Sequence, residues 1–162
     1  MTPYRPLNRS VAGRVAIVTG AASGMGRATA HLFAREGASV AVTDLDLSAC
    51  EAVVTELAAD GVHSARAFAL DVGDHAAIKS VVPTIAETFG GIDILVNNAG
   101  VSCFSPLDGG DEYDAVWVRA LNVMLTGQQR MVRAALPWRR ASDAARIVNI
   151  ASTEGLGARP GD

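Results

Sequence analysis

The stretch from Arg14 to Ala28, RVAIVTGAASGMGRA, decides the fold. Its first six residues form a short apolar run rich in β-branched side chains, which is typical of a buried strand in a parallel sheet. Apolar residues then recur at helical spacing from Met25 to Arg35, and Gly37 is the expected C-cap. A strand that passes through a glycine-rich turn into a helix is the first unit of an α/β sheet.

Strand and helix patterns alternate along the rest of the chain. Ser48 is the expected N-cap of the second helix, Pro83 should kink the third or mark an irregular turn, and Pro137 should end the fourth. Alternation with short connections predicts a Rossmann-type, doubly wound parallel α/β sheet of five strands, with helices on both faces. The expected further strands are 39–43, 65–70, 92–96 and 146–150, and the further helices are 48–59, 74–89 and 111–136.

The composition excludes several classes of protein. Hydrophobic residues make up 49% of the 162 residues and the net charge is −3, so a disordered chain or a basic nucleic-acid binder is not expected. Cys50 and Cys103 are the two cysteines, which predicts neither a disulfide framework nor a metal or redox centre. No run is long enough to span a membrane, and residues 1–12 lack the apolar core of a signal peptide, so the cytoplasm is the expected location.

Three glycines after the first strand form a candidate phosphate-binding turn. The chain must turn sharply there, and its backbone must approach a pyrophosphate closely, which side chains would obstruct. The helix that follows offers free N–H groups and the positive end of its dipole. The spacing of Gly20, Gly24 and Gly26 departs from G-x-G-x-x-G, so a tight turn without any ligand remains an alternative.

An acidic residue ends the second strand. Asp44 lies about 20 residues after Gly24, where a carboxylate accepts hydrogen bonds from the adenosine ribose and would repel the extra phosphate of NADP. Ser23, before Gly24, offers no positive charge for that phosphate. These residues favour NAD over NADP. Asp46 is an alternative acceptor, and Asp44 could instead cap the helix near Ser48.

Three further segments extend the pattern. They are Asp71-Val72 after the third strand, ILVNNAG at 94–100 and RIVNIAS at 146–152. With the glycine-rich stretch, and in this order and spacing, they resemble the classical short-chain dehydrogenase/reductase family. The resemblance runs from about Gly13 to Ser152 and implies an oxidoreductase that transfers hydride between NAD and a secondary alcohol or ketone. Residues 13–162 would then be an incomplete dinucleotide-binding domain that follows an N-terminal arm, 1–12.

The same resemblance implies which residues hold the cofactor. Asp71 would bond the amino edge of adenine beside Val72, Met25 would add a backbone amide to the phosphate turn, and Asn97 would brace the sheet. Asp71 could instead cap the next helix, and 97–100 could be a simple strand-end turn. The candidate cofactor-binding residues are Gly20, Ser23, Gly24, Met25, Gly26, Asp44, Asp71, Val72, Asn98, Ala99, Gly100 and Ile150.

Two residues match catalytic positions of the family. Ser152 is similar to the serine whose hydroxyl polarises the substrate carbonyl, and Asn122 to the asparagine whose backbone carbonyl holds a water of a proton relay. Alternatively, Asn122 is an ordinary helix amide and Ser152 a polar residue past a strand end. The family's general acid/base is a tyrosine with a lysine four positions later. Tyr4 and Tyr113 have no such lysine, and the only lysine, Lys79, is expected on a solvated helix surface.

The absence of this pair from the 162 residues leads to further expectations. The chain is expected to be part of a longer enzyme, or a truncated gene product, that binds NAD without turning it over. Strand 146–150 would then be an uncovered edge. The complete chain is expected to be a homo-oligomer acting on a small molecule, without nucleic-acid or membrane partners. The alternatives are a non-catalytic NAD-binding module or degenerate paralogue, and an α/β interaction domain that binds no nucleotide.

Overall fold

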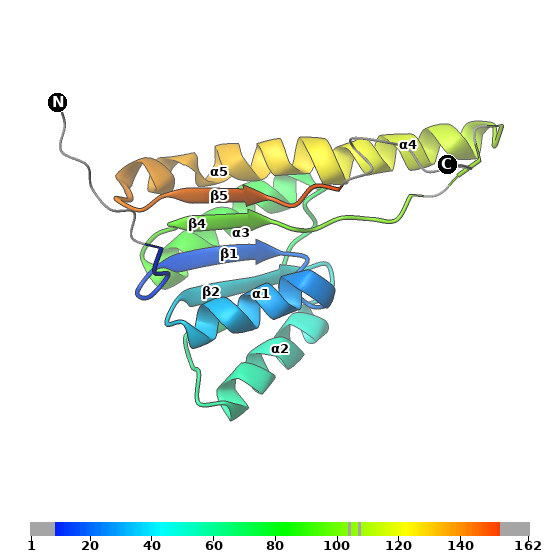
Figure 1. Ribbon diagram of the computed structural model, residues 1–162. Coiled ribbons are helices and arrows are strands. Elements are labelled where there is room, and N and C mark those ends of the chain that lie inside the picture. The colour runs from blue at the N-terminus through cyan, green and yellow to red at the C-terminus, as the bar shows by residue number, and fades with distance from the viewer. Residues whose placement is uncertain (1–8, 104, 107, 153–162) are drawn as a thin grey trace.

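The computed structural model describes residues 9–103, 105–106 and 108–152. Five strands form one parallel sheet in the order β3-β2-β1-β4-β5 (Figure 1). The order reverses direction between β1 and β4, which confirms the predicted doubly wound, Rossmann-type α/β fold. The strands are β1 (Val15–Thr19), β2 (Ser39–Asp44), β3 (Ala65–Ala69), β4 (Ile94–Asn97) and β5 (Arg146–Asn149).

Helices cover both faces of the sheet. One apolar layer joins Val18 and Val42 to the helices α1 (Gly24–Arg35) and α2 (Leu47–Ala59). The other layer joins Ile17 to α3 (His75–Phe89) and α5 (Gln128–Ala141). Successive residues of a strand point to opposite faces, so a central strand that is covered on both sides reads as a continuous apolar run.

The helix starts differ from expectation at α2. The Asp46 carboxylate, and not Ser48, caps α2 by accepting hydrogen bonds from the N–H groups of Ser48 and Ala49 at 2.9 and 3.4 Å. The prediction that Ser48 is the cap is therefore wrong. Asp46 takes this position because its carboxylate, besides accepting the two hydrogen bonds, stabilises the positive end of the helix dipole. In α3 there is no irregular turn at Pro83, since the helix continues from His75 to Phe89.

The predicted helix 111–136 is instead made of three segments. They are α4 (Asp111–Leu121), a π-helical turn η1 (Asn122–Gly127) and α5. The turn lies where the backbone passes close to the segment after β3: a Cβ on Gly127 would stand 2.6 Å from the Val72 carbonyl oxygen. A π turn accommodates an extra residue without ending the helix. In Figure 1, α5 runs alongside β5 over the length of the strands, whereas α4 extends beyond the strand ends.

The expected helix end at Pro137 is also wrong. The helix continues to Ala141, with Pro137 inside it. The turn after the proline is held by Arg139, a buried side chain whose guanidinium donates to the carbonyl oxygens of Asp93, at 2.9 Å, and Arg146. These bonds tie the last turn to the neighbouring strands, and they offset the backbone hydrogen bond that proline cannot make.

Within the described residues, β5 is an edge strand that pairs only with β4. The side chains of Ile147 and Val148 are 41% and 42% exposed. The buried Asn97 side chain donates from Nδ2 to Oδ1 of Asn149 at 2.8 Å, so it braces β4 against β5 as expected.

Candidate cofactor-binding site

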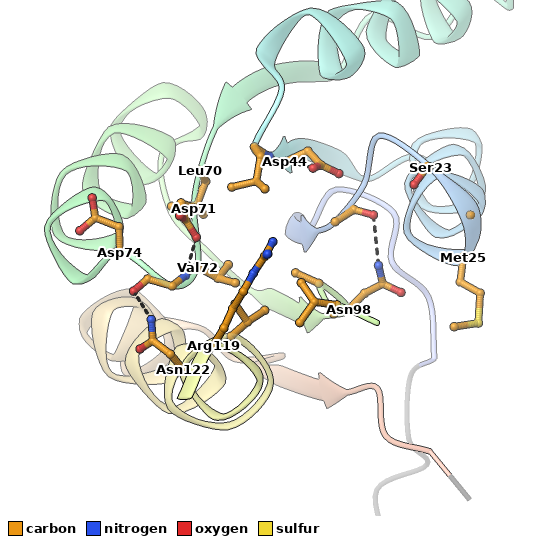
Figure 2. Close-up of a pocket in the computed structure, with 18 residues that line it drawn as sticks. Ser23, Met25, Asp44, Leu70, Asp71, Val72, Asp74, Asn98, Arg119 and Asn122 are labelled. Carbon is orange, nitrogen blue, oxygen red and sulfur yellow. Dashed lines mark hydrogen bonds between the residues drawn. The ribbon is translucent and has the colours of Figure 1, made fainter. Parts of the chain in front are cut away.

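A cleft of about 520 Å³ opens at the carboxyl ends of the strands (Figure 2). In doubly wound sheets, ligands bind at this edge, where the order of the strands reverses. The volume of the cleft is in the range of sites that bind small molecules. The cleft is lined by Gly20, Ser23, Gly24, Met25, Asp44, Leu45, Leu70, Asp71, Val72, Gly73, Asp74, Asn98, Ala99, Gly100, Val101, Arg119, Asn122 and Val123.

Most of the candidate residues from the sequence line this cleft, and three do not. Gly26 is buried beneath the glycine turn. Ile150 follows β5, where its N–H donates to the Asn97 carbonyl at 2.9 Å, and its side chain is 37% exposed. Ser152 is exposed two residues further on. The described structure therefore groups the candidates of the first four strands, except the buried Gly26, and does not bring the two residues after β5 into the cleft.

Sequence reasoning missed seven lining residues. Six of them are next to, or one residue removed from, a predicted site residue, so their position follows from the same strand and helix ends. The seventh, Arg119, is one helical turn before Asn122, and only helical spacing could have indicated it. The seven are Leu45, Leu70, Gly73, Asp74, Val101, Arg119 and Val123.

The glycine turn has the geometry that its residues predict. Gly20 and Gly24 have φ angles of +64° and +52°, in the left-handed region that favours glycine. A Cβ on Gly26 would stand 2.1 Å from the Gly20 carbonyl oxygen. The first turn of α1 therefore packs against the end of β1 at a distance that only glycine allows.

The start of α1 is open to a ligand. Ser23 is the N-cap of α1, and its side chain makes no capping hydrogen bond. By contrast, α2 and α3 are capped by Asp46 and Asp74, whose carboxylates accept from first-turn N–H groups. The first N–H groups of α1 thus lack the side-chain partner that the other two helices have, and Gly24 and Met25 line the cleft. Such a terminus binds anions.

The end of β4 is fixed to the glycine turn. The Thr19 hydroxyl accepts hydrogen bonds from the N–H groups of Asn98 and Ala99, both at 3.0 Å. The Asn98 side chain donates from Nδ2 to the carbonyl oxygens of Thr19 and Gly20, at 2.9 and 3.1 Å. These bonds hold the two walls of the cleft, β1 and β4, in a fixed relation.

The acidic residue that ends β2 and the acidic residue two positions later have different tasks. Asp44 lines the cleft, and its carboxylate accepts from the N–H groups of Ala22 at 3.1 Å and Leu45 at 2.8 Å. Asp46 faces its own helix as the cap of α2. The bond with Ser48 is the main reason why the pKa of the Asp46 carboxyl lies below its usual value. The alternative that Asp44 caps this helix is therefore wrong.

The loop after β3 is joined to the long helix through Asn122. The Asp71 carboxylate accepts from the Gly73 N–H at 2.7 Å, while Asp74 caps α3. The Asn122 amide donates from Nδ2 to the Gly73 carbonyl at 2.8 Å, and its Oδ1 accepts from Nη1 of Arg130 at 3.0 Å. The Asn122 side chain thus fastens the π turn to the loop that carries Asp71.

The described part of the chain lacks two other features. No group of three or more His, Cys, Asp or Glu side chains is arranged to hold a metal ion. No helix there has the length and apolar character needed to cross a membrane.

The fold and the cleft define an α/β protein of the Rossmann-type class. The chain belongs to the short chain dehydrogenase family, whose model matches residues 14–161. This result confirms the resemblance found in the sequence. Members of this family are oxidoreductases that generally bind NAD or NADP.

Individual relatives give the extent of the likeness. The chain is 40% identical to the D-threitol dehydrogenase of Mycolicibacterium smegmatis over 141 residues, which cover 86% of this chain and 53% of the relative. It is 40% identical to the galactitol 2-dehydrogenase of Agrobacterium fabrum over 143 residues, which cover 88% and 54%. The chain thus spans about half the length of the curated relatives it matches.

A solved structure agrees with these relatives. The crystal structure of a candidate short-chain alcohol dehydrogenase from Sinorhizobium meliloti 1021 aligns with a TM-score of 0.84 and 34% identity. The alignment covers 93% of this chain and 58% of that one. The five-stranded sheet described above therefore corresponds to part of a larger fold in that protein.

Proposed function

We propose that the full-length protein is an NAD-dependent oxidoreductase that transfers hydride between NAD and a secondary alcohol or ketone. The observation that carries the proposal is the Asp44 carboxylate, which lines the cleft and is held by two backbone N–H groups. Ribose hydroxyls can donate to a carboxylate in that position, whereas the 2′-phosphate of NADP would meet a negative charge. The D-threitol and galactitol dehydrogenases among the relatives support a small alcohol as substrate.

Donor groups that NAD would use line the cleft. The pyrophosphate would lie at the uncapped start of α1, where Gly24 and Met25 present backbone N–H groups. The adenosine ribose would bond Asp44 at the end of β2, and the adenine would reach Asp71 and Val72. Bound NAD supplies the hydride acceptor of the reaction, while the protein residues orient both partners.

The proton chemistry is assigned by resemblance to the family. The Ser152 hydroxyl would polarise the substrate carbonyl, and the backbone carbonyl of Asn122 would hold a water of the proton relay. Phenol has an ordinary pKa near ~10, so a general acid/base tyrosine needs an ammonium group close by. The 162 residues contain no tyrosine with a lysine four positions later. A protein of residues 1–162 alone is therefore proposed to bind NAD without turnover.

The cofactor preference can be tested with Asp44→Asn in the full-length protein. Removal of the charge should weaken NAD binding about tenfold. It should also reduce the difference between the affinity for NAD and the affinity for NADP. Asp46→Asn is the matched control, because Asp46 caps α2 and does not line the cleft. That variant should keep the ratio of NAD affinity to NADP affinity that the wild type has. An unchanged ratio in Asp44→Asn would contradict the assignment of Asp44 and the preference for NAD.

A second candidate is a non-catalytic NAD-binding module. The described cleft fits this candidate equally, because the residues that line it are candidates for binding the cofactor and not for turnover alone. The two candidates differ in one assay on the full-length protein, the oxidation of polyols with NAD followed by absorbance of NADH. Binding of NADH in a fluorescence titration without any turnover would favour the module.

We also propose that the full-length protein is a homo-oligomer. None of the residues of α4 is buried, and its Trp117 and Val118 side chains are 55% and 64% exposed. Apolar side chains that are exposed together on one helix are typical of an interface. Light scattering of the full-length protein tests this: a monomer mass at micromolar concentration would contradict it.

A further inference from the structure

Arg119 is the only basic residue among the described residues that line the cleft. It belongs to the last turn of α4, across the cleft from the strand ends. In Figure 2 its side chain extends from that helix into the middle of the cleft, toward the side where Asp44 and Asp71 lie. Within the described part of the chain, its guanidinium has no hydrogen bond or ion pair. A long cationic side chain is thus directed into the cleft without a protein partner.

The acidic side chains nearby do not account for this orientation. The carboxylates of Asp44, Asp71 and Asp74 each accept hydrogen bonds from backbone N–H groups. None of them forms an ion pair with Arg119 among the described residues. An exposed arginine without a partner gains nothing from a fixed position, because ordering its side chain costs conformational entropy. The cleft therefore provides a guanidinium group that a bound molecule could use.

The order of the strands indicates which part of the ligand this is. The phosphates belong at the start of α1 after β1, and the adenosine ribose at Asp44 after β2. The order β3-β2-β1 continues the same direction toward the end of β3. The base must therefore lie beside the segment after β3, where Leu70 and Val72 are buried and form an apolar wall. Arg119 reaches toward this part of the cleft from the opposite side.

We propose that Arg119 covers the adenine base, with its planar guanidinium stacked on the face of the ring that is turned away from Leu70 and Val72. The proposal rests on the proposed function, since it requires that the cleft binds an adenine dinucleotide. Guanidinium groups stack on aromatic rings and on nucleobases, and the cation is attracted to the π-face. Lysine lacks the flat surface that this contact needs. Arg119 is thus an adenine-binding residue, supplied by the last turn of α4, directly before the π turn that begins with Asn122.

The test compares ligands that contain the base with ligands that do not. The full-length wild type, Arg119→Ala, Arg119→Lys and the control Arg133→Ala are titrated with NAD, adenosine and nicotinamide mononucleotide. Arg133 is exposed on α5 and does not line the cleft. Arg119→Ala should bind NAD and adenosine about fivefold more weakly, by the same factor for both, and bind nicotinamide mononucleotide like the wild type. Arg119→Lys should be weakened nearly as much, and Arg133→Ala should not differ from the wild type.

Other outcomes would overturn the proposal. A loss for NAD but not for adenosine, restored in Arg119→Lys, would show that the residue acts as a counter-charge for phosphate. NADP is titrated alongside as a further ligand, and a loss seen only with NADP would assign Arg119 to the 2′-phosphate. Equal affinities in all four proteins would show that Arg119 does not contact the ligand. If the wild type does not bind NAD, the proposed function itself is wrong. The melting temperature of each variant shows whether it is folded. If Arg119→Ala does not fold, Arg119→Lys still tests the proposal.

Discussion

Gly26 approaches the Gly20 carbonyl oxygen so closely that a Cβ on Gly26 would stand 2.1 Å from it. The same carbonyl accepts a hydrogen bond from the Asn98 side chain at 3.1 Å, so it cannot move freely. In this way one backbone oxygen links α1, β1 and the end of β4. The position of the cleft wall depends on the absence of a side chain at residue 26.

Gly26→Ala should therefore push α1 away from β1. We expect a loss of about 1–3 kcal/mol in the free energy of unfolding, with weaker NAD binding, because overpacking a close contact has that cost. Gly24→Ala is the comparison, because a Cβ there meets nothing within 4 Å and only the φ of +52° is unfavourable. Thermal unfolding and NAD titration measure both effects. A Gly26→Ala protein that is as stable as the wild type would contradict the steric argument.

Arg130 should contribute to the cleft through Asn122. Arg130→Met removes the donor to Asn122 Oδ1 and a longer bond, at 3.4 Å, to the Gly73 carbonyl, and leaves the bond from Asn122 to Gly73 in place. We expect a loss of about 1 kcal/mol in unfolding free energy and weaker NAD binding, because the loop that carries Asp71 is less firmly held. A double-mutant cycle with Asn122→Ala should give a coupling energy of about 0.5 kcal/mol or more. Additive effects would mean that the two side chains act independently.

The two cysteines should differ in reactivity. Burial raises the pKa of the Cys50 thiol to about 11, so at pH 8 this thiol is almost entirely protonated. Only the thiolate reacts with alkylating reagents. Iodoacetamide should therefore modify the half-buried Cys103 and leave Cys50 unmodified until denaturant is added. Peptide mass spectrometry measures this, and equal rates of alkylation in the folded protein would contradict the prediction.

Glu56 should make stability depend on pH in the acid range. Arg27 and His31 both reach Glu56 Oε2, at 2.6 and 3.0 Å, and the bond from Arg27 is the main cause of a lowered pKa. A carboxyl group whose pKa is lower in the folded state stabilises the protein above its unfolded value of 4.5, and this is lost as pH falls through the folded pKa. The stability difference between wild type and Glu56→Gln should thus be small but present at pH 6, and should disappear in acid.

Denaturant unfolding at several pH values measures this difference. Glu51→Gln is the control, since the exposed Glu51 side chain has no ion pair among the described residues. The control should follow the wild type at each pH. A difference between wild type and Glu56→Gln that grows as the pH falls would contradict the sign of the effect.

The fold and most of the cleft could be predicted because they depend on local patterns. The apolar run before Thr19 and the glycines after it are a contiguous signal for strand, turn and helix. The meeting of Asp44 and Asp71 with that turn then follows from topology, since the carboxyl ends of parallel strands share one edge. No contact between distant residues had to be known.

The features that were not predicted depend on competition or on distant contacts. Asp46 and Ser48 are both good caps, and their spacing does not decide between them. The π turn occurs where Gly127 passes the Val72 carbonyl, a contact that the pattern of either segment alone does not contain. Helical spacing places Arg119 on the same side of the helix as Asn122, but it does not indicate that this side faces the cleft.

The π turn also sets the rotational phase of the helix that follows it. One added residue rotates everything after it by about 100° about the helix axis, compared with an uninterrupted α-helix. With this rotation Met131 and Ala135 of α5 are completely buried against the sheet, while Leu121 and Leu125 are exposed. The orientation of α5 about its own axis is thereby offset from that of α4 by this fixed rotation. Insertions or deletions between Asn122 and Gly127 would therefore change which side of α5 meets the sheet, while the loops after β1 and β2 keep their positions.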